Sequence, residues 1–210
     1  MEIAGQTAQV DSLFESTRDY CRKYLAEGNP DFSVTVSRED LAFEQEALRL
    51  EALEEGIKTR VFTDPFLERT VIQEKIAEKL LEQDTLLLHG STVAVDGQAY
   101  LFTAPCGTGK STHTRLWCQV FGDRAVMIND DKPFLKITDK GVWAGGSPWS
   151  GKHGLDTNIH VPLAGICILE RGREDAIRRA LEAETAFLFS QSHRPEDPAL
   201  QPLAAELTGQ

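Results

Sequence analysis

One stretch of nine residues constrains this chain more than any other, because it combines glycines, a lysine and hydroxyl side chains in a fixed order. It reads Ala-Pro-Cys-Gly-Thr-Gly-Lys-Ser-Thr and spans residues 104–112. An apolar run, residues 99–103, precedes it and predicts a buried strand, whereas residues 114–121 predict a helix. A strand, a glycine-rich turn and a helix opened by Gly-Lys-Ser form the sequence context of a phosphate-binding loop, the P-loop or Walker A motif.

The residue types of this loop suit the binding of a polyphosphate. Glycines allow backbone N–H groups to converge on an anion without clashes from Cβ atoms. The free N–H groups and the dipole of the following helix favour negative charge at the same point. Lys110 can reach the β- and γ-phosphates of a nucleotide, and the hydroxyl of Ser111 can ligate Mg²⁺. We therefore expect seven residues to bind ATP phosphates: Cys106, Gly107, Thr108, Gly109, Lys110, Ser111 and Thr112.

The loop departs from the usual pattern G-x-x-x-x-G-K-[ST] at its first position, where Ala104 replaces glycine. A glycine-rich turn with an unrelated lysine is the alternative interpretation. Cys106 also lies inside the loop, close to a helix N-terminus, where thiols can become reactive. The alternative for Cys106 is a small side chain that the loop tolerates.

Two adjacent carboxylates, Asp130 and Asp131, follow the apolar strand predicted at residues 125–128. In enzymes with a phosphate loop, a strand-terminal aspartate holds Mg²⁺ or its waters. A second carboxylate can accept the proton of an attacking hydroxyl. The alternative is a simple turn signal, because Asn-Asp-Asp after a strand is also good loop chemistry.

Two further segments hold candidate residues. His89 follows the apolar run 86–88, and its alternative role is that of a half-buried structural histidine. Residues 147–154 combine glycines, Trp149 and Lys152, which suits a mobile lid that brings positive charge to a transferring phosphoryl group. An ordinary surface loop is the alternative there.

Composition narrows the class of partner. The formal net charge is −11, with −9 in residues 1–85 and −2 in residues 86–210. This balance argues against broad binding to nucleic acids or anionic membranes, and the nearly neutral second part suits a polyanionic nucleotide. No signal peptide, membrane-spanning run or C-x-x-C pair is present, so we expect a cytoplasmic protein with reduced thiols.

Periodicity and turn signals predict two parts. Residues 1–85 form a helix-rich segment of unknown role, with helices at 11–27, 39–55 and from Asp64, and a strand at 32–36. Residues 86–210 form the nucleotide-binding domain. Its predicted elements are hairpins at 96–97 and 138–141, a central strand at 164–169, one or two helices in 174–192 and an irregular tail that ends in a short helix.

The order of these motifs resembles a known family. His89-Gly90-Ser91, a hairpin, Gly107 to Ser111 and then Asp130-Asp131 are similar to the catalytic domain of HPr kinase/phosphorylase. They also resemble the nucleotide half of ATP-dependent phosphoenolpyruvate carboxykinase, which shares that fold. The likeness covers about residues 86–172, and the hairpin directly before the phosphate loop is typical of this group.

The resemblance implies an α/β fold with a mixed, partly antiparallel sheet, and it implies roles for single residues. Lys110 and the loop amides would hold ATP, while Ser111 and Asp131 would hold Mg²⁺. Asp130 would be the base that activates an acceptor hydroxyl, and His89 would lie beside the metal or the acceptor. Lys152 would correspond to the basic residue of a later loop that also contacts the nucleotide.

The resemblance predicts a kinase that moves the γ-phosphoryl group of ATP to a serine-like hydroxyl on a protein, peptide or small molecule, and that self-associates. The family's glutamate is missing from residues 148–152. That departure, with Ala104 and Cys106, favours the alternative of a non-catalytic nucleotide-binding module. A phosphoenolpyruvate-utilising relative would need several arginines, yet residues 86–169 contain only Arg115 and Arg124.

Overall fold

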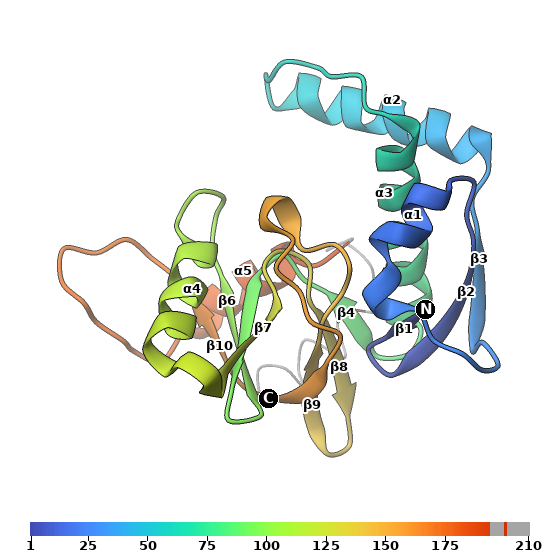
Figure 1. The fold of residues 1–210 in the computed structure, drawn as a ribbon. Helices are drawn as coiled ribbons and strands as arrows, with labels where there is room; N and C mark the ends of the chain where they lie inside the picture. The colour runs from blue at the N-terminus through green and yellow to red at the C-terminus, as the bar shows by residue number, and fades with distance from the viewer. Residues whose placement is uncertain (194–199, 201–210) are drawn as a thin grey trace. The chain divides into compact units, whose positions relative to one another are not determined.

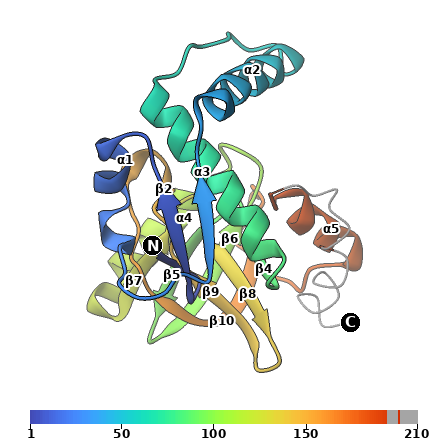
Figure 2. The ribbon, with the colours of Figure 1, turned by 90° about the vertical axis from the view of Figure 1, so that its right-hand side faces the viewer.

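A computed structural model of the chain describes residues 1–193 and residue 200. The chain divides into two compact units. The first consists of residues 1–2 and 6–79, and the second consists of residues 3–5 and the chain from Leu80 onward. Most helices and strands of both units are labelled in Figure 1, and β5 is labelled in Figure 2.

The first unit combines helices with a three-stranded sheet of order β1-β2-β3. The strands β2 and β3 pair in parallel, with Ala8 opposite Phe32. The helices α1 and α3 lie on the same side of this sheet (Figures 1 and 2). The bounds of the elements are β1 Glu2–Ile3, β2 Gln6–Asp11, α1 Glu15–Tyr20, η1 Arg22–Tyr24, β3 Phe32–Thr35, α2 Arg38–Glu54 and α3 Asp64–Leu81.

The helix predicted at residues 11–27 is wrong in its extent, because α1 contains only six residues and Asp11 belongs to β2. A fully buried carboxylate fixes the start of α1. Glu68 of α3 accepts hydrogen bonds from the backbone N–H of Leu13 and the hydroxyl of Thr17. Because a buried carboxylate needs such donors, the position of α1 depends on a long-range contact rather than on local periodicity.

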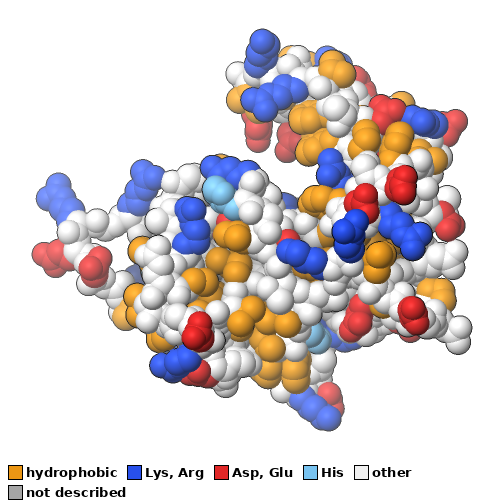
Figure 3. Space-filling view, in the orientation of Figure 1, with side chains coloured by type: hydrophobic (Ala, Val, Ile, Leu, Met, Phe, Trp, Pro, Cys, Tyr) orange, Lys and Arg blue, Asp and Glu red, His pale blue; other side chains and the backbone are white. Residues whose placement is uncertain are grey.

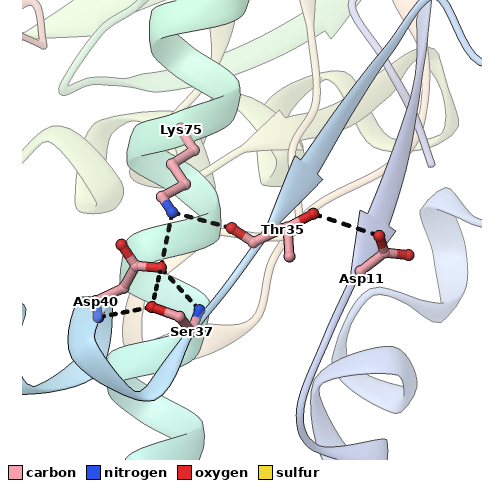
Figure 4. A network of polar contacts seen from close by, with 5 residues as sticks. All are labelled: Asp11, Thr35, Ser37, Asp40 and Lys75. Atoms are coloured by element: carbon pink, nitrogen blue, oxygen red, sulfur yellow. Dashed lines mark hydrogen bonds and ion pairs between the residues drawn. The ribbon is translucent and has the colours of Figure 1, made fainter.

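The helix α2 confirms the prediction of a helix capped by Ser37. The Ser37 hydroxyl accepts a hydrogen bond from the Asp40 N–H, and the Asp40 carboxylate accepts one from the Ser37 N–H, which forms a capping box. Lys75 of α3 donates to the same carboxylate at 2.8 Å and to the carbonyl of Thr35 at 2.9 Å (Figure 4). This network joins the end of β3 to the two long helices.

The second unit contains a seven-stranded sheet of order β4-β8-β9-β10-β6-β5-β7. Among its strand pairs only β10 and β6 are parallel, so the sheet is mixed and partly antiparallel, as predicted. The strand β10 occupies the fourth of seven positions, which confirms the predicted central strand. The bounds are β4 Thr85–Leu87, β5 Ser91–Val95, β6 Gln98–Thr103, β7 Ala125–Asn129, β8 Phe134–Thr138, β9 Gly141–Gly145 and β10 His160–Ile168.

Both hairpins predicted from turn residues are present. The strands β5 and β6 are joined through Asp96 and Gly97, which both have positive φ, and β8 pairs with β9 across the second turn. The helix α4 (Lys110–Phe121) packs across β5, β6 and β7. Short 3₁₀ turns, η2 (Gly122–Arg124) and η3 (Gly151–His153), follow α4 and β9.

An apolar cluster that includes Leu88, Leu101, Ile128, Leu135 and Leu188 forms the core of this unit. Leu188 belongs to α5 (Glu182–Ser190), so the helical prediction for residues 174–192 is correct only in its second half. The preceding segment does not bury its large apolar side chains, since Ile177 is 94 % and Leu181 64 % exposed, and a short helix without packing is only marginally stable. The prediction for the C-terminal tail concerns residues outside the described part of the chain. No helix of the described residues is long and apolar enough to cross a membrane.

Candidate functional site

The sheet of the second unit brings the three predicted motifs to one edge. The strand β5 lies antiparallel between β6 and β7, so β6 and β7 run in the same direction and end where β5 begins. The glycine loop follows β6, the two aspartates follow β7 and His89 precedes β5. Direct bonds join them: the Gly90 N–H donates to the Asp131 carbonyl at 3.0 Å, and the Thr103 hydroxyl donates to the His89 carbonyl at 3.0 Å.

The glycine loop connects β6 to α4 as predicted, and its two glycines explain the turn. Gly107 and Gly109 have φ values of +75° and +121°, a region that side chains of L-residues rarely enter. Ala104 is fully buried and does not have a positive φ, so alanine meets no backbone strain at the position where the usual pattern has glycine. Cys106 is exposed in the same loop.

Lys110 opens α4 and folds back along the loop. Its side chain is nearly buried, at 9 % exposure, and Nζ donates a hydrogen bond to the Ala104 carbonyl at 2.8 Å. Burial lowers the pKa of Lys110, and the nearby Cys106 and Asp131 act against this shift. The ammonium group is therefore partly desolvated beside a carboxylate, and an anion held by the loop would gain a strong interaction with it.

The two aspartates after β7 have different surroundings. Asp130 is 6 % exposed, and its Oδ1 accepts a hydrogen bond from the Ser91 hydroxyl at 2.7 Å. The Ser91 oxygen lies 2.7 Å from the hydroxyl of Thr114 on α4. The backbone N–H of Asp130 donates to the Leu155 carbonyl at 3.1 Å. Both the backbone and the side chain of Asp130 are therefore fixed.

Asp131 is the more accessible carboxylate. Its Oδ1 lies 3.3 Å from His89 Nε2, and about one third of each side chain is exposed. Gly151 approaches it so closely that a Cβ at residue 151 would lie 3.1 Å from the Asp131 Cβ. Any larger residue at 151 would push against the carboxylate, so Gly151 leaves Asp131 the space in which it can meet a ligand.

The segment after β9 lies against the end of β7. Asn129 donates to the Ser147 carbonyl at 2.8 Å, and the Ser150 hydroxyl donates to Asp156 at 2.8 Å. Ser147, Trp149 and Ser150 are buried. Residues 147–150 are therefore packed against the end of β7, and the exposed part of the predicted lid is the tip 151–154 with Lys152.

Sequence reasoning missed several residues at this edge. The sequence indicates Ser91 only as part of the His-Gly-Ser motif and Thr114 only as part of a predicted helix. Arg171 donates a hydrogen bond to the Gly107 carbonyl at 2.6 Å. The sequence signal for Arg171 is its position just after the strand predicted at 164–169. In the structure this strand, β10, is parallel to β6 and ends at the same edge. The Ser91 and Thr114 contacts have no signal in the sequence.

The side chains at this edge offer oxygen atoms of the kind that Mg²⁺ prefers. Within residues 1–193 no group of three or more His, Cys, Asp or Glu side chains is arranged to hold a metal. Mg²⁺ in nucleotide-binding enzymes commonly uses one or two protein oxygens together with substrate phosphates and waters. Asp131 and the Ser111 hydroxyl can supply those oxygens.

A cavity of about 320 Å³ lies elsewhere, within the first unit. It is lined by residues of β2, α1 and the chain near Gly28, with Cys21 and Ile72 among them. Burial raises the pKa of Cys21 to about 11, so this thiol is protonated at neutral pH. None of the lining residues belongs to the sheet edge described above.

The second unit is thus an α/β domain in which a glycine loop, a lysine and two carboxylates share one edge of a mixed sheet. No protein-family model matches this chain, and no curated protein matches it either.

Proposed function

We propose that this protein is an ATP- and Mg²⁺-dependent kinase that transfers the γ-phosphoryl group to a serine-like hydroxyl on a protein, peptide or small molecule. The observation that supports the proposal is the meeting of Lys110, Asp130 and Asp131 at one sheet edge. Phosphoryl transfer needs positioning and charge neutralisation more than covalent chemistry, and this set of residues suits both tasks.

Each group has a role in the proposed reaction. The loop amides and Lys110 bind the phosphates, and Mg²⁺ bound by Asp131 and Ser111 would neutralise charge on them. The acceptor oxygen forms a bond to the γ-phosphorus, while the bond between this phosphorus and the β–γ bridging oxygen breaks and ADP leaves. The acceptor proton passes to Asp130. His89 assists beside Asp131. Lys152 assists from the exposed tip, residues 151–154, of the segment after β9.

One observation favours a second candidate, a nucleotide-binding module without catalysis. Asp130 is only 6 % exposed and one of its oxygens is already used by Ser91, which leaves little of this carboxylate for an acceptor. In such a module the same carboxylate would only hold the sheet edge together.

A transfer assay with γ-labelled ATP and Mg²⁺ separates the two candidates. Free serine, serine-containing peptides and a soluble extract of the source cell are offered as acceptors, and Asp130→Asn is assayed beside the wild type. We expect label in one acceptor with the wild type only and unchanged ATP affinity in Asp130→Asn. Tight ATP binding without transfer to any acceptor would favour the binding module, and full activity of Asp130→Asn would exclude that residue as the base.

A further inference from the structure

Three polar side chains from three elements meet behind the phosphate loop. Ser91 begins β5, Thr114 lies on α4 and Asp130 follows β7. Ser91 and Thr114 are fully buried, and Asp130 is nearly so. We propose that Ser91 and Thr114 form a hydroxyl pair that positions Asp130 relative to the phosphate-loop helix, an inference whose kinetic consequence rests on the proposed kinase function.

The hydrogen-bond geometry sets the direction of this chain of hydroxyls. A carboxylate only accepts hydrogen bonds, so Ser91 donates its one proton to Asp130 at 2.7 Å. In the 2.7 Å contact between the two hydroxyls, Thr114 is therefore the donor and Ser91 is the acceptor. The other acceptors near Thr114, the carbonyls of Lys110 and Ser111, lie farther away at 3.4 Å. The bonds run from Thr114 to Ser91 and from Ser91 to Asp130.

This arrangement connects the proposed base to the element that starts with Lys110 and Ser111. Thr114 lies one helical turn beyond Lys110 on the same helix, so the hydroxyl pair fixes the carboxylate with respect to the phosphate site. Catalytic rates fall steeply when reacting groups are displaced by about 1 Å. Removal of either hydroxyl also leaves a buried polar atom without its partner, which favours a rearrangement of Asp130.

The neighbouring residue Thr92 provides a matched control. Thr92 is also fully buried on β5, and its hydroxyl has no hydrogen-bond partner in the described structure. Successive side chains of a strand point to opposite faces, so the Thr92 side chain lies on the face away from Ser91. Thr92→Val removes a buried hydroxyl from the same strand without touching the proposed chain of bonds.

The experiment compares Ser91→Ala, Thr114→Val, Thr114→Ser and Thr92→Val with the wild type. For each variant, kcat and KM of phosphoryl transfer, the Kd of ATP and the far-UV circular dichroism spectrum are measured. We expect Ser91→Ala and Thr114→Val to lower kcat about 10- to 100-fold while the Kd of ATP changes less than about twofold. Thr114→Ser keeps the hydroxyl and should retain most of the wild-type kcat, and Thr92→Val should match the wild type.

Two results would overturn the inference: a kcat within about twofold of wild type in folded Thr114→Val, or an equal loss of kcat in Thr92→Val. If Ser91→Ala does not fold, the pair Thr114→Val and Thr114→Ser decides. If the wild type transfers phosphate to no acceptor, the kinase proposal fails separately. The positioning contact is then tested by a double-mutant cycle of Ser91→Ala and Asp130→Ala in urea unfolding, where strict additivity would overturn it.

Discussion

Burial of a charged side chain is the feature that most clearly separates Lys110 from the other lysines of the chain. Its ammonium group has given up part of its hydration, its pKa is lowered by burial, and its described hydrogen bond goes to the Ala104 carbonyl. Such a group gains more from a phosphate than a hydrated surface lysine does, because both charges interact in a medium of lower effective dielectric constant.

We therefore predict that Lys110→Ala weakens ATP binding by about tenfold or more, which corresponds to about 1.4 kcal/mol. Isothermal titration calorimetry measures the Kd. Lys140→Ala, which removes an exposed lysine from the β8–β9 turn, is the control for the loss of one positive charge and should bind as the wild type does. Equal affinity in Lys110→Ala and the wild type would remove the basis of the phosphate-loop assignment.

Glu68 is the corresponding case in the first unit, where a charged group has a structural role. Its carboxylate is fully buried and accepts bonds from Leu13 and Thr17. Glu68→Ala leaves both donors without a partner, so we predict a loss of about 2–4 kcal/mol in the free energy of unfolding. Urea denaturation followed by circular dichroism measures the loss. The exposed Glu27→Ala should differ from the wild type by less than about 0.5 kcal/mol, and a similar value for Glu68→Ala would contradict the structural role.

At the scale of elements, α2 carries a carboxyl group, that of Glu44, which favours its protonated form because it is buried beside Glu74 of α3. Glu44 of α2 is 4 % exposed, and burial, followed by the charges of Glu74 and Glu51, raises its pKa to about 7. The folded state therefore holds this proton more tightly than the unfolded state, whose pKa is near the ordinary value of 4.5. The stability that Glu44 contributes is fully present below pH 4.5 and is lost as the pH rises through 7.

Glu44→Gln imitates the protonated side chain and should remove this dependence. We predict that at pH 8 the variant exceeds the wild type by about 1–3 kcal/mol in the free energy of unfolding, and that the difference disappears near pH 4.5. Urea titrations at several pH values measure both curves. Glu54→Gln, an exposed position of the same helix, is the control. Equal stability of Glu44→Gln and the wild type at pH 8 would show that the negative charge of Glu44 does not destabilise the folded protein.

The elements that sequence reasoning found correctly depend on local signals. The Ser37 cap, the Asp96-Gly97 turn and the start of α4 after Gly109 each follow from the conformational preferences of a few adjacent residues. The same is true of the glycine loop itself.

What could not be predicted depends on contacts between distant residues. The bond between Ser91 and Asp130 spans 39 positions, and that between Leu13 and Glu68 spans 55. Gly151 meets Asp131 only because the segment after β9 returns to the end of β7. Residues 174–181 show the opposite error. Local helical periodicity does not make a helix there, because the apolar side chains of Ile177 and Leu181 are exposed and not packed.

At the scale of the whole molecule, the uneven distribution of charge along the chain affects which ligands the protein can attract. The net charge of −9 in residues 1–85 contrasts with −2 in the remainder. On the face drawn in Figure 3, each unit carries both basic and acidic side chains. We infer that an anionic ligand would be recognised at a local site such as the phosphate loop, and not by the general field of the protein.

The three tryptophans make it possible to follow the second unit alone. Trp117, Trp143 and Trp149 all lie in the chain from Leu80 onward, so tryptophan fluorescence reports on the unit that contains the glycine loop. A ligand that binds only the folded state raises the free energy of unfolding by about 2.7 kcal/mol at 100 times its Kd. We predict that MgATP at this concentration raises the midpoint of the fluorescence-detected melting curve by about 5–15 °C.

The dependence of this shift on single residues tests the site as a whole. At the same MgATP concentration, Lys110→Ala should show about half of the wild-type shift or less, because a tenfold weaker Kd leaves only about 1.4 kcal/mol of stabilisation. Asp130→Asn should keep the shift of the wild type, because it removes only the base. Asp131→Asn should reduce the difference between MgATP and ATP without Mg²⁺, since its carboxylate is the proposed metal ligand. A shift of equal size in Lys110→Ala would mean that the nucleotide stabilises the protein from another place, and both the loop assignment and the proposed reaction would then be wrong.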